Sequence, residues 1–118
     1  MSDLVPKYRI AHVGINHPNQ EEALDTAKKL CAIFDLEPKD ETGTHIFAGS
    51  LFEVKKNCLK GTYGHIAMQT DDLETAIEHL AKKGIHVKEE SIRRNAEGRI
   101  QFAYLDLEIA GFAFHLML

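Results

Sequence analysis

The chain has 118 residues, of which 44% are hydrophobic and 27% carry a charged side chain. This length allows one domain with a hydrophobic core and is too short for two independent ones. The composition excludes disorder as the default state. The formal net charge is −4 and the basic residues form no continuous stripe, so we expect no nucleic-acid partner.

The cellular compartment is predicted from features that the sequence lacks. No apolar run approaches the roughly 20 residues that a membrane-spanning helix needs, so we expect no membrane partner. Residues 1–7 lack the charged start and apolar stretch of a signal peptide. The cysteines, Cys31 and Cys58, are unclustered and form neither a disulfide framework nor a zinc motif. We therefore expect a cytoplasmic protein.

The first half of the chain predicts a strand, a helix and a hairpin. Residues 8–16 alternate as a strand does, and the pair Asn19 and Glu22 is a capping box that begins a helix. Residues 45–48 and 51–55, separated by Gly49 and Ser50, predict a hairpin. A further strand between residues 35 and 44 is hard to locate. The apolar stripe of the helix consists of Ala23, Leu24, Ala27, Leu30, Cys31 and Phe34.

The second half repeats this order. Residues 62–70 predict a strand, and Asp71 with Glu74 predicts the start of a helix. Strands are expected at 85–93, 99–106 and 111–118. Residues 11–15 are echoed by residues 64–68, so that His12 and His65 lie 53 residues apart. We therefore predict one α+β domain, residues 8–118, built from two βαβββ modules at about 8–58 and 62–118 that form a curled sheet.

Strand alternation gives four strands one metal-competent residue each. In the last strand, Phe112, Phe114 and Leu116 share one face and His115 lies on the other. The same alternation places one such residue mid-strand, opposite an apolar helix-packing face, in the other three strands. A divalent ion takes three or four nitrogen or oxygen ligands at about 2.0–2.2 Å. The predicted ligands of one divalent ion are therefore His12, Glu53, His65 and His115.

Other polar and aromatic residues are weaker candidates. Position along the strands suggests that substrate contacts come from Phe47, Tyr63, Gln101 and Tyr104, and a register error of one residue would reverse each facing. Arg99 is a further substrate-binding candidate, because it flanks the expected hairpin loop with Arg93 and Arg94, and one of these arginines could bind a carboxylate or phosphate bidentately. Solvated surface lysines are favoured over an anion site for Lys55, Lys56 and Lys60. The remaining histidines, interpreted as surface or structural residues, are His17, His45, His79 and His86.

The ligand strands resemble those of a known superfamily. Residues 10–14, 52–54 and 63–67 are similar to the metal-binding strands of the glyoxalase/bleomycin resistance/extradiol dioxygenase (vicinal oxygen chelate) superfamily. His12, Glu53 and His65 match its residue types, whereas His115 stands where glyoxalase I-like members have a second Glu. A closer resemblance, through residues 10–16, 46–49, 64–67 and 111–116, is to the small glyoxalase-like domain associated with bacterial KDPG/KHG aldolases.

The resemblance implies a metal-dependent lyase or isomerase acting on a small 2-oxo or 2-hydroxy acid. A metal-bound His115 cannot act as the proton-transfer base, which argues against glyoxalase I activity itself, and the sequence identifies no other base. The alternatives are a non-catalytic metal- and metabolite-binding module working with a KDPG-type aldolase, and oxygenase chemistry. The ligand set does not distinguish Zn, Ni, Mn and Fe. Members often dimerise, so we expect a homodimer, with the metal site within one chain or across two.

Overall fold

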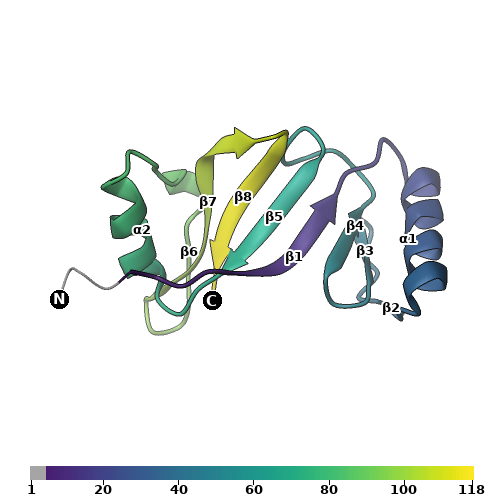
Figure 1. Cartoon of the computed structure of the whole chain (residues 1–118), viewed down its shortest axis with the longest axis horizontal. Helices are drawn as coiled ribbons and strands as arrows, with labels where there is room; N and C mark the ends of the chain where they lie inside the picture. The colour runs from purple at the N-terminus through teal and green to yellow at the C-terminus, as the bar shows by residue number, and fades with distance from the viewer. Residues whose placement is uncertain (1–4) are drawn as a thin grey trace.

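The computed structural model describes residues 5–118, in which two helices and eight strands form an α+β fold (Figure 1). The first half contains β1 (Arg9–Ile15), α1 (Gln20–Phe34), β2 (Pro38–Lys39), β3 (His45–Ala48) and β4 (Phe52–Lys55). The second half contains β5 (Gly64–Gln69), α2 (Leu73–Ala81), the 3-10 helix η1 (Glu89–Ser91), β6 (Arg93–Arg94), β7 (Ile100–Ile109) and β8 (Phe112–Met117). Each half thus has one strand, one α-helix and three further strands.

The strands form one mixed sheet, in the order β2-β3-β4-β1-β5-β8-β7-β6. The two halves meet at β1 and β5, which pair in antiparallel orientation. Within each half the first strand pairs in parallel with the last, β1 with β4 and β5 with β8. The described part of the sheet does not close, so β2 and β6 are its edges. The first strands of the two halves, with their parallel partners, therefore occupy the middle of the sheet.

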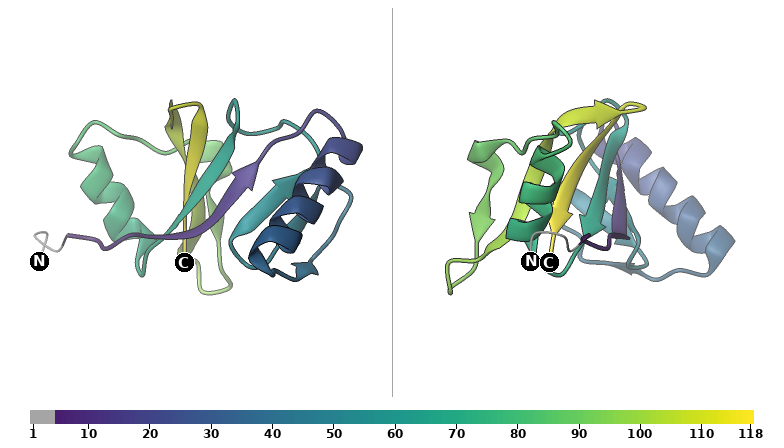
Figure 2. Two further views of the ribbon diagram at one scale, coloured as in Figure 1. Left: turned by 45° about the vertical axis from the view of Figure 1, so that its right-hand side comes forward. Right: turned by 60° about the vertical axis from the view of Figure 1, so that its left-hand side comes forward.

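Each helix covers its own half of the sheet. Helix α1 packs on β3 and β4 through a core of Ala23, Ala27, Ile46 and Val54. Helix α2 packs on the other half through a core of Leu73, Ala76, Ile100 and Leu116. Figures 1 and 2 show the helices at opposite ends of the molecule, with β1, β5 and β8 between them. None of the helices within residues 5–118 is long and apolar enough to cross a membrane.

The helix starts follow side-chain capping. At α1 the Asn19 carboxamide accepts a hydrogen bond from the Glu22 backbone N–H (2.9 Å), as predicted. The second bond differs from that of a capping box, because the Glu22 carboxylate accepts from the Asn19 side-chain amide (3.0 Å) and not from its backbone N–H. At α2 the cap is Asp72, which accepts from the Thr75 N–H (3.1 Å), and not the predicted Asp71. The prediction was wrong by one residue because Glu74 accepts a hydrogen bond from the Ile100 N–H (3.0 Å) and so ties the helix to β7.

Two further expectations differ from the structure. Phe34 is 60% exposed, because the core beneath α1 reaches only to Leu30 and the helix ends at Asp35 in a left-handed conformation. Residues 85–93 do not form a continuous strand. The Ser91 hydroxyl donates to the Lys88 carbonyl (2.6 Å) and accepts from the Tyr104 N–H (2.8 Å), so the 3-10 helix η1 replaces the expected strand ladder there.

Candidate metal centre

The register of the central strands brings the predicted ligands together around two small residues. Gly14 of β1 lies opposite His65 of β5 and beside Glu53 of β4. Ala67 of β5 lies opposite His12 of β1 and beside His115 of β8. Gly14 and Ala67 have the same sequence spacing as His12 and His65, so the two halves place their candidate ligands in equivalent registers. All four side chains come from one chain, and the arrangement needs no second copy.

The absence of a side chain at Gly14 makes room for the imidazole of His65. A Cβ atom added to Gly14 would lie 2.1 Å from Cε1 and 2.3 Å from Nδ1 of His65. Real Cβ atoms do not approach other heavy atoms so closely, so any larger residue would push the ring away. Gly14 therefore leaves the space that the buried His65 ring occupies in the candidate site.

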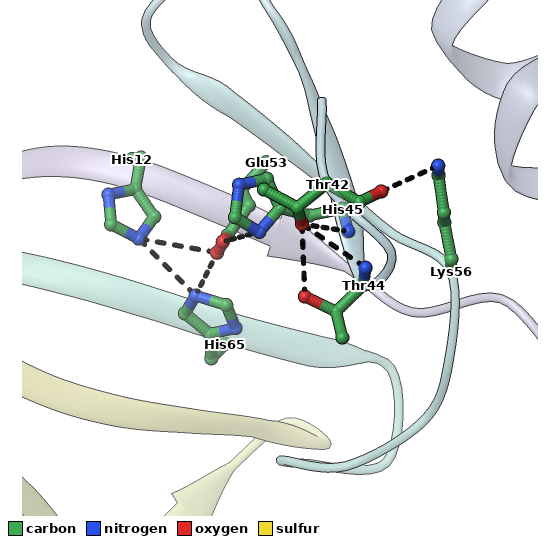
Figure 3. A network of polar contacts seen from close by, with 7 residues as sticks. All are labelled: His12, Thr42, Thr44, His45, Glu53, Lys56 and His65. Atoms are coloured by element: carbon green, nitrogen blue, oxygen red, sulfur yellow. Dashed lines mark hydrogen bonds and ion pairs between the residues drawn. The ribbon is translucent and has the colours of Figure 1, made fainter. Parts of the chain in front are cut away.

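Three donor atoms converge at the centre of the sheet (Figure 3). The Nε2 atoms of His12 and His65 are 3.3 Å apart. Oε1 of Glu53 lies 2.9 Å from Nε2 of His65 and 3.6 Å from Nε2 of His12. Ligand atoms that share an ion at about 2.0–2.2 Å are separated from each other by about 3.0–3.5 Å. The triangle formed by these atoms therefore has the dimensions of a metal site.

His115 completes the histidine cluster. Among the described residues, His12, His65 and His115 offer ligand nitrogens that all lie within 4.8 Å of one another. The ring centroid of His115 is 5.5 Å from that of His12 and 5.4 Å from that of His65. Three histidines thus lie close enough together to bind a metal ion, and the Glu53 carboxylate lies against two of them.

The electrostatics of the cluster keep its groups in metal-binding form. Burial alone would raise the pKa of Glu53, but its hydrogen bond with His65 and the nearby positive charges lower the pKa to about 2. Burial lowers the pKa of His12, and burial with the neighbouring histidines lowers the pKa of His115 to about 4. A neutral imidazole and an ionised carboxylate are the forms that bind metals.

Unused hydrogen-bonding capacity at His115 also fits a ligand role. The residue is 3% exposed, and its Nδ1 atom is buried without a hydrogen-bond partner among the described residues. Buried polar atoms are almost always paired, so an orphaned ring nitrogen requires a reason. Together with the donor spacing, it fits a set of residues arranged to hold a divalent ion.

The cluster forms one wall of a cavity of about 270 Å³. The rest of the lining includes residues of β7 and β8, where Tyr104 pairs with His115 and Phe102 pairs with Met117. Burial, with a smaller effect of the Glu53 charge, raises the pKa of Tyr104 to about 12, so its hydroxyl is protonated at neutral pH and is available as a hydrogen-bond donor. The cavity lining consists of His12, Glu53, Lys55, His65, Phe102, Tyr104, His115 and Met117.

The residues predicted to bind substrate are scattered. Phe47 lies at the cluster, with its ring 5.7 Å from that of His12. Gln101, by contrast, is exposed and alternates with the cavity residue Phe102, so it faces the other way. Tyr63 is 63% exposed and packs against Phe112. None of Phe47, Tyr63, Gln101 and Arg99 lines the cavity in the described part of the chain.

Arg99 has a structural environment instead. Its guanidinium lies 3.2 Å from the Asp72 carboxylate and 3.3 Å from that of Glu74, at the first turn of α2. This pairing directs the side chain to the helix and away from the cavity. The acidic residues that cap the helix therefore account for the position of Arg99.

Sequence reasoning missed His45. Its Nδ1 atom lies 3.2 Å from Oε2 of Glu53, on the side of the carboxylate away from His65 (Figure 3). The signal was present in the hairpin register, since Phe47 pairs with Glu53 and the alternate residue of β3 shares the same face. Sequence reasoning also favoured a solvated surface role for Lys55, which lines the cavity.

Comparison with known proteins gives a likeness of fold. No protein-family model and no curated protein matches the chain. Among solved structures, the chain is similar to the crystal structure of hypothetical protein BH1468 from Bacillus halodurans C-125, with a TM-score of 0.59. The sequence identity is 16%, and the match covers 94% of each chain. This likeness extends over nearly the whole molecule and concerns the fold alone.

Proposed function

We propose that the chain is a metal-dependent protein of the glyoxalase-like (vicinal oxygen chelate) superfamily, a lyase or isomerase that acts on a small 2-oxo or 2-hydroxy acid. The observation that carries the proposal is the convergence of His12, His65 and His115 beside the Glu53 carboxylate in one cavity. The occurrence of a βαβββ order in both halves, with equivalent ligand registers, supports the family assignment.

In this proposal the ligands have separate roles. The three histidines would hold the ion through ring nitrogens, and the Glu53 carboxylate would reduce the formal charge of the centre from +2 to +1. A divalent ion bound by these residues would supply Lewis-acid chemistry to a 2-oxo or 2-hydroxy acid. Phe102 and Met117 form an apolar part of the cavity lining beside the candidate ligands.

A second candidate is a non-catalytic metal- and metabolite-binding module that works with a KDPG-type aldolase. It is favoured by one observation: among the described residues, the cavity lining contains no carboxylate or histidine other than the four candidate ligands. Tyr104 is protonated at neutral pH, and His115 stands where glyoxalase I-like members have a carboxylate. The two candidates share the metal centre and differ in whether a proton is removed from the bound acid.

The test begins with metal-free protein. Elemental analysis after loading separately with Zn²⁺, Ni²⁺, Mn²⁺ and Co²⁺ should give about one ion per chain, and the His65→Ala variant should retain none. Proton NMR in deuterated water then follows exchange at C3 of 2-oxobutyrate. Exchange that requires the ion supports the enzyme, whereas ion-dependent binding without exchange supports the binding module. Failure of all four ions to bind would contradict both.

The predicted homodimer is a separate proposal. Since the ligands converge within one chain, a dimer is not needed to complete the site. Sedimentation equilibrium, with and without the ion, distinguishes a dimer of about twice 13.3 kDa from a monomer.

A further inference from the structure

The cavity contains one cation that the fold leaves unused. Lys55 alternates with Glu53 on β4, so both side chains lie on the cavity face of the sheet, and Lys55 lines the cavity. Among the described residues its side chain has no ion pair or hydrogen bond. The neighbouring Lys56, on the other face, is held by the Glu41 carboxylate (2.8 Å) and the Thr42 carbonyl (2.7 Å). Lys55 therefore differs from a lysine that serves the fold.

The Tyr104 side chain, which carries a hydrogen-bond donor, belongs to the same cavity lining. The ring of Tyr104 is 5.1 Å from that of His115, and the ammonium group of Lys60 lies 4.9 Å from the centroid of the Tyr104 ring. Strand pairing and this cation–π contact fix the ring at the cavity wall. The ion position is thus flanked by Lys55 from the first half of the chain and by Tyr104 from the second.

The formal charge of the ion-loaded cavity indicates which ligand charge it would neutralise. A divalent ion, the Glu53 carboxylate and the Lys55 ammonium sum to +2, so a monoanionic acid leaves one positive charge unmatched and a dianion leaves none. The adjoining cavity of about 370 Å³, which shares Tyr104, has two lysines and two acids, Lys60, Lys88, Asp106 and Glu108, and hence no net charge. The unmatched cation therefore lies within the metal cavity.

We propose that the site selects short 2-oxo dicarboxylates, with the 2-oxo acid group on the ion and the second carboxylate on the ammonium group of Lys55, within reach of the Tyr104 hydroxyl. The inference rests on the proposed function, because it assumes that the ion binds a 2-oxo acid. The volume of about 270 Å³ lies just below the range of roughly 300–1,000 Å³ that holds drug-sized ligands, which suits a ligand of a few carbons.

The experiment compares two acids of equal chain length, 2-oxoglutarate and 2-oxopentanoate, which differ in the second carboxylate. Their dissociation constants are measured by calorimetry on the Zn²⁺-loaded protein. We expect 2-oxoglutarate to bind about 10- to 100-fold more tightly, as charged hydrogen bonds typically contribute. Lys55→Met should remove most of this preference, because it should weaken binding of 2-oxoglutarate far more than binding of 2-oxopentanoate. Lys83→Met, an exposed lysine beyond α2, is the matched control and should keep the preference.

The outcomes separate this inference from the proposed function. Equal binding of the two acids, or a preference that survives Lys55→Met, overturns the dicarboxylate inference and leaves the metal-dependent 2-oxo acid site in place. Failure of both acids to bind the ion-loaded protein overturns both proposals. The ion content of each variant is measured first, and if Lys55→Met binds less ion, Lys55→Gln, which keeps a polar side chain, provides the comparison.

Discussion

The two halves of the sheet place a histidine at equivalent positions and differ in the second candidate ligand of each half. His12 and His65 occupy the same register in their strands, whereas the position beside Gly14 is Glu53 and the position beside Ala67 is His115. The surroundings differ in the same sense. The first half adds the polar residues His45 and Lys55, and the second half adds an aromatic wall.

This difference shows how a repeated backbone can produce an asymmetric site. Pairing register fixes where each side chain emerges, and substitution at one equivalent position sets whether that point carries a negative charge or a neutral imidazole. The first half therefore supplies charge, and the second half supplies apolar cover and a hydrogen-bond donor. A chelated substrate would be oriented by this contrast between the halves.

The largest effect should come from removing one of the two histidines that occupy equivalent positions in the halves. His65→Ala deletes the residue whose Nε2 atom contacts both His12 and Glu53. We expect affinity for Zn²⁺ to fall more than 100-fold, because loss of a ligand exceeds the 10–100-fold typical of outer residues. Competition with a chromophoric chelator measures the constant. His86→Ala, at an exposed site, is the control, and equal affinities for the two variants would contradict the assignment.

The second prediction removes the difference between Gly14 and Ala67, the small residues at equivalent positions of the two halves. Gly14→Ala places a Cβ atom 2.1 Å from the His65 ring, so the ring must move. We expect a loss of about 1–3 kcal/mol in the free energy of unfolding, as overpacking typically costs, together with weaker ion binding. Denaturant unfolding of metal-free protein checks this. Gly43→Ala, where an added Cβ meets nothing within 4 Å, should change neither quantity.

The third prediction concerns the polar support of Glu53. His45 holds the second carboxylate oxygen at 3.2 Å and so orients the first toward the cluster. His45→Ala should weaken ion binding by about tenfold, within the range for groups that position ligands. His45→Gln retains an N–H donor and should recover most of the affinity. The visible spectrum of the Co²⁺ form should shift in the alanine variant; an unchanged spectrum would rule out a positioning role.

The last prediction tests the apolar side of the comparison through pH. Burial lowers the pKa of His115 from 6.5 to about 4, so the unfolded chain binds a proton that the folded chain excludes between these values. The metal-free protein should therefore lose up to about 1.4 kcal/mol of stability per pH unit as pH falls from about 6.5 toward 4. His115→Gln should reduce this slope in urea unfolding. A slope equal to that of the unmodified chain would contradict the buried neutral imidazole.

Strand alternation was enough to predict much of the site. It placed His12, Glu53, His65 and His115 opposite the helix-packing faces, and the structure brings these four residues together in one cavity. The repeat of residues 11–15 at 64–68 also predicted which strands begin the two halves. These features depend on local periodicity and on pairing between central strands, and the sequence pattern indicates both.

Features that depend on longer-range choices were harder to predict. Arg99 found acidic partners at the start of α2, which no local pattern indicates. The Ser91 hydroxyl replaced a strand ladder by a 3-10 helix. His45 was overlooked because its contact with Glu53 depends on how β3 pairs with β4. Since His45 begins the predicted strand, alternation within that strand alone does not indicate which face its side chain occupies.

X-ray absorption of the Zn²⁺-loaded protein tests the metal centre most directly, because it counts and identifies the atoms around the ion. The account predicts about three imidazole nitrogens at about 2.0–2.1 Å and an oxygen shell at about 2.0–2.2 Å, with one imidazole lost in the His115→Ala variant. A spectrum with oxygen neighbours alone, unchanged by that substitution, would contradict it.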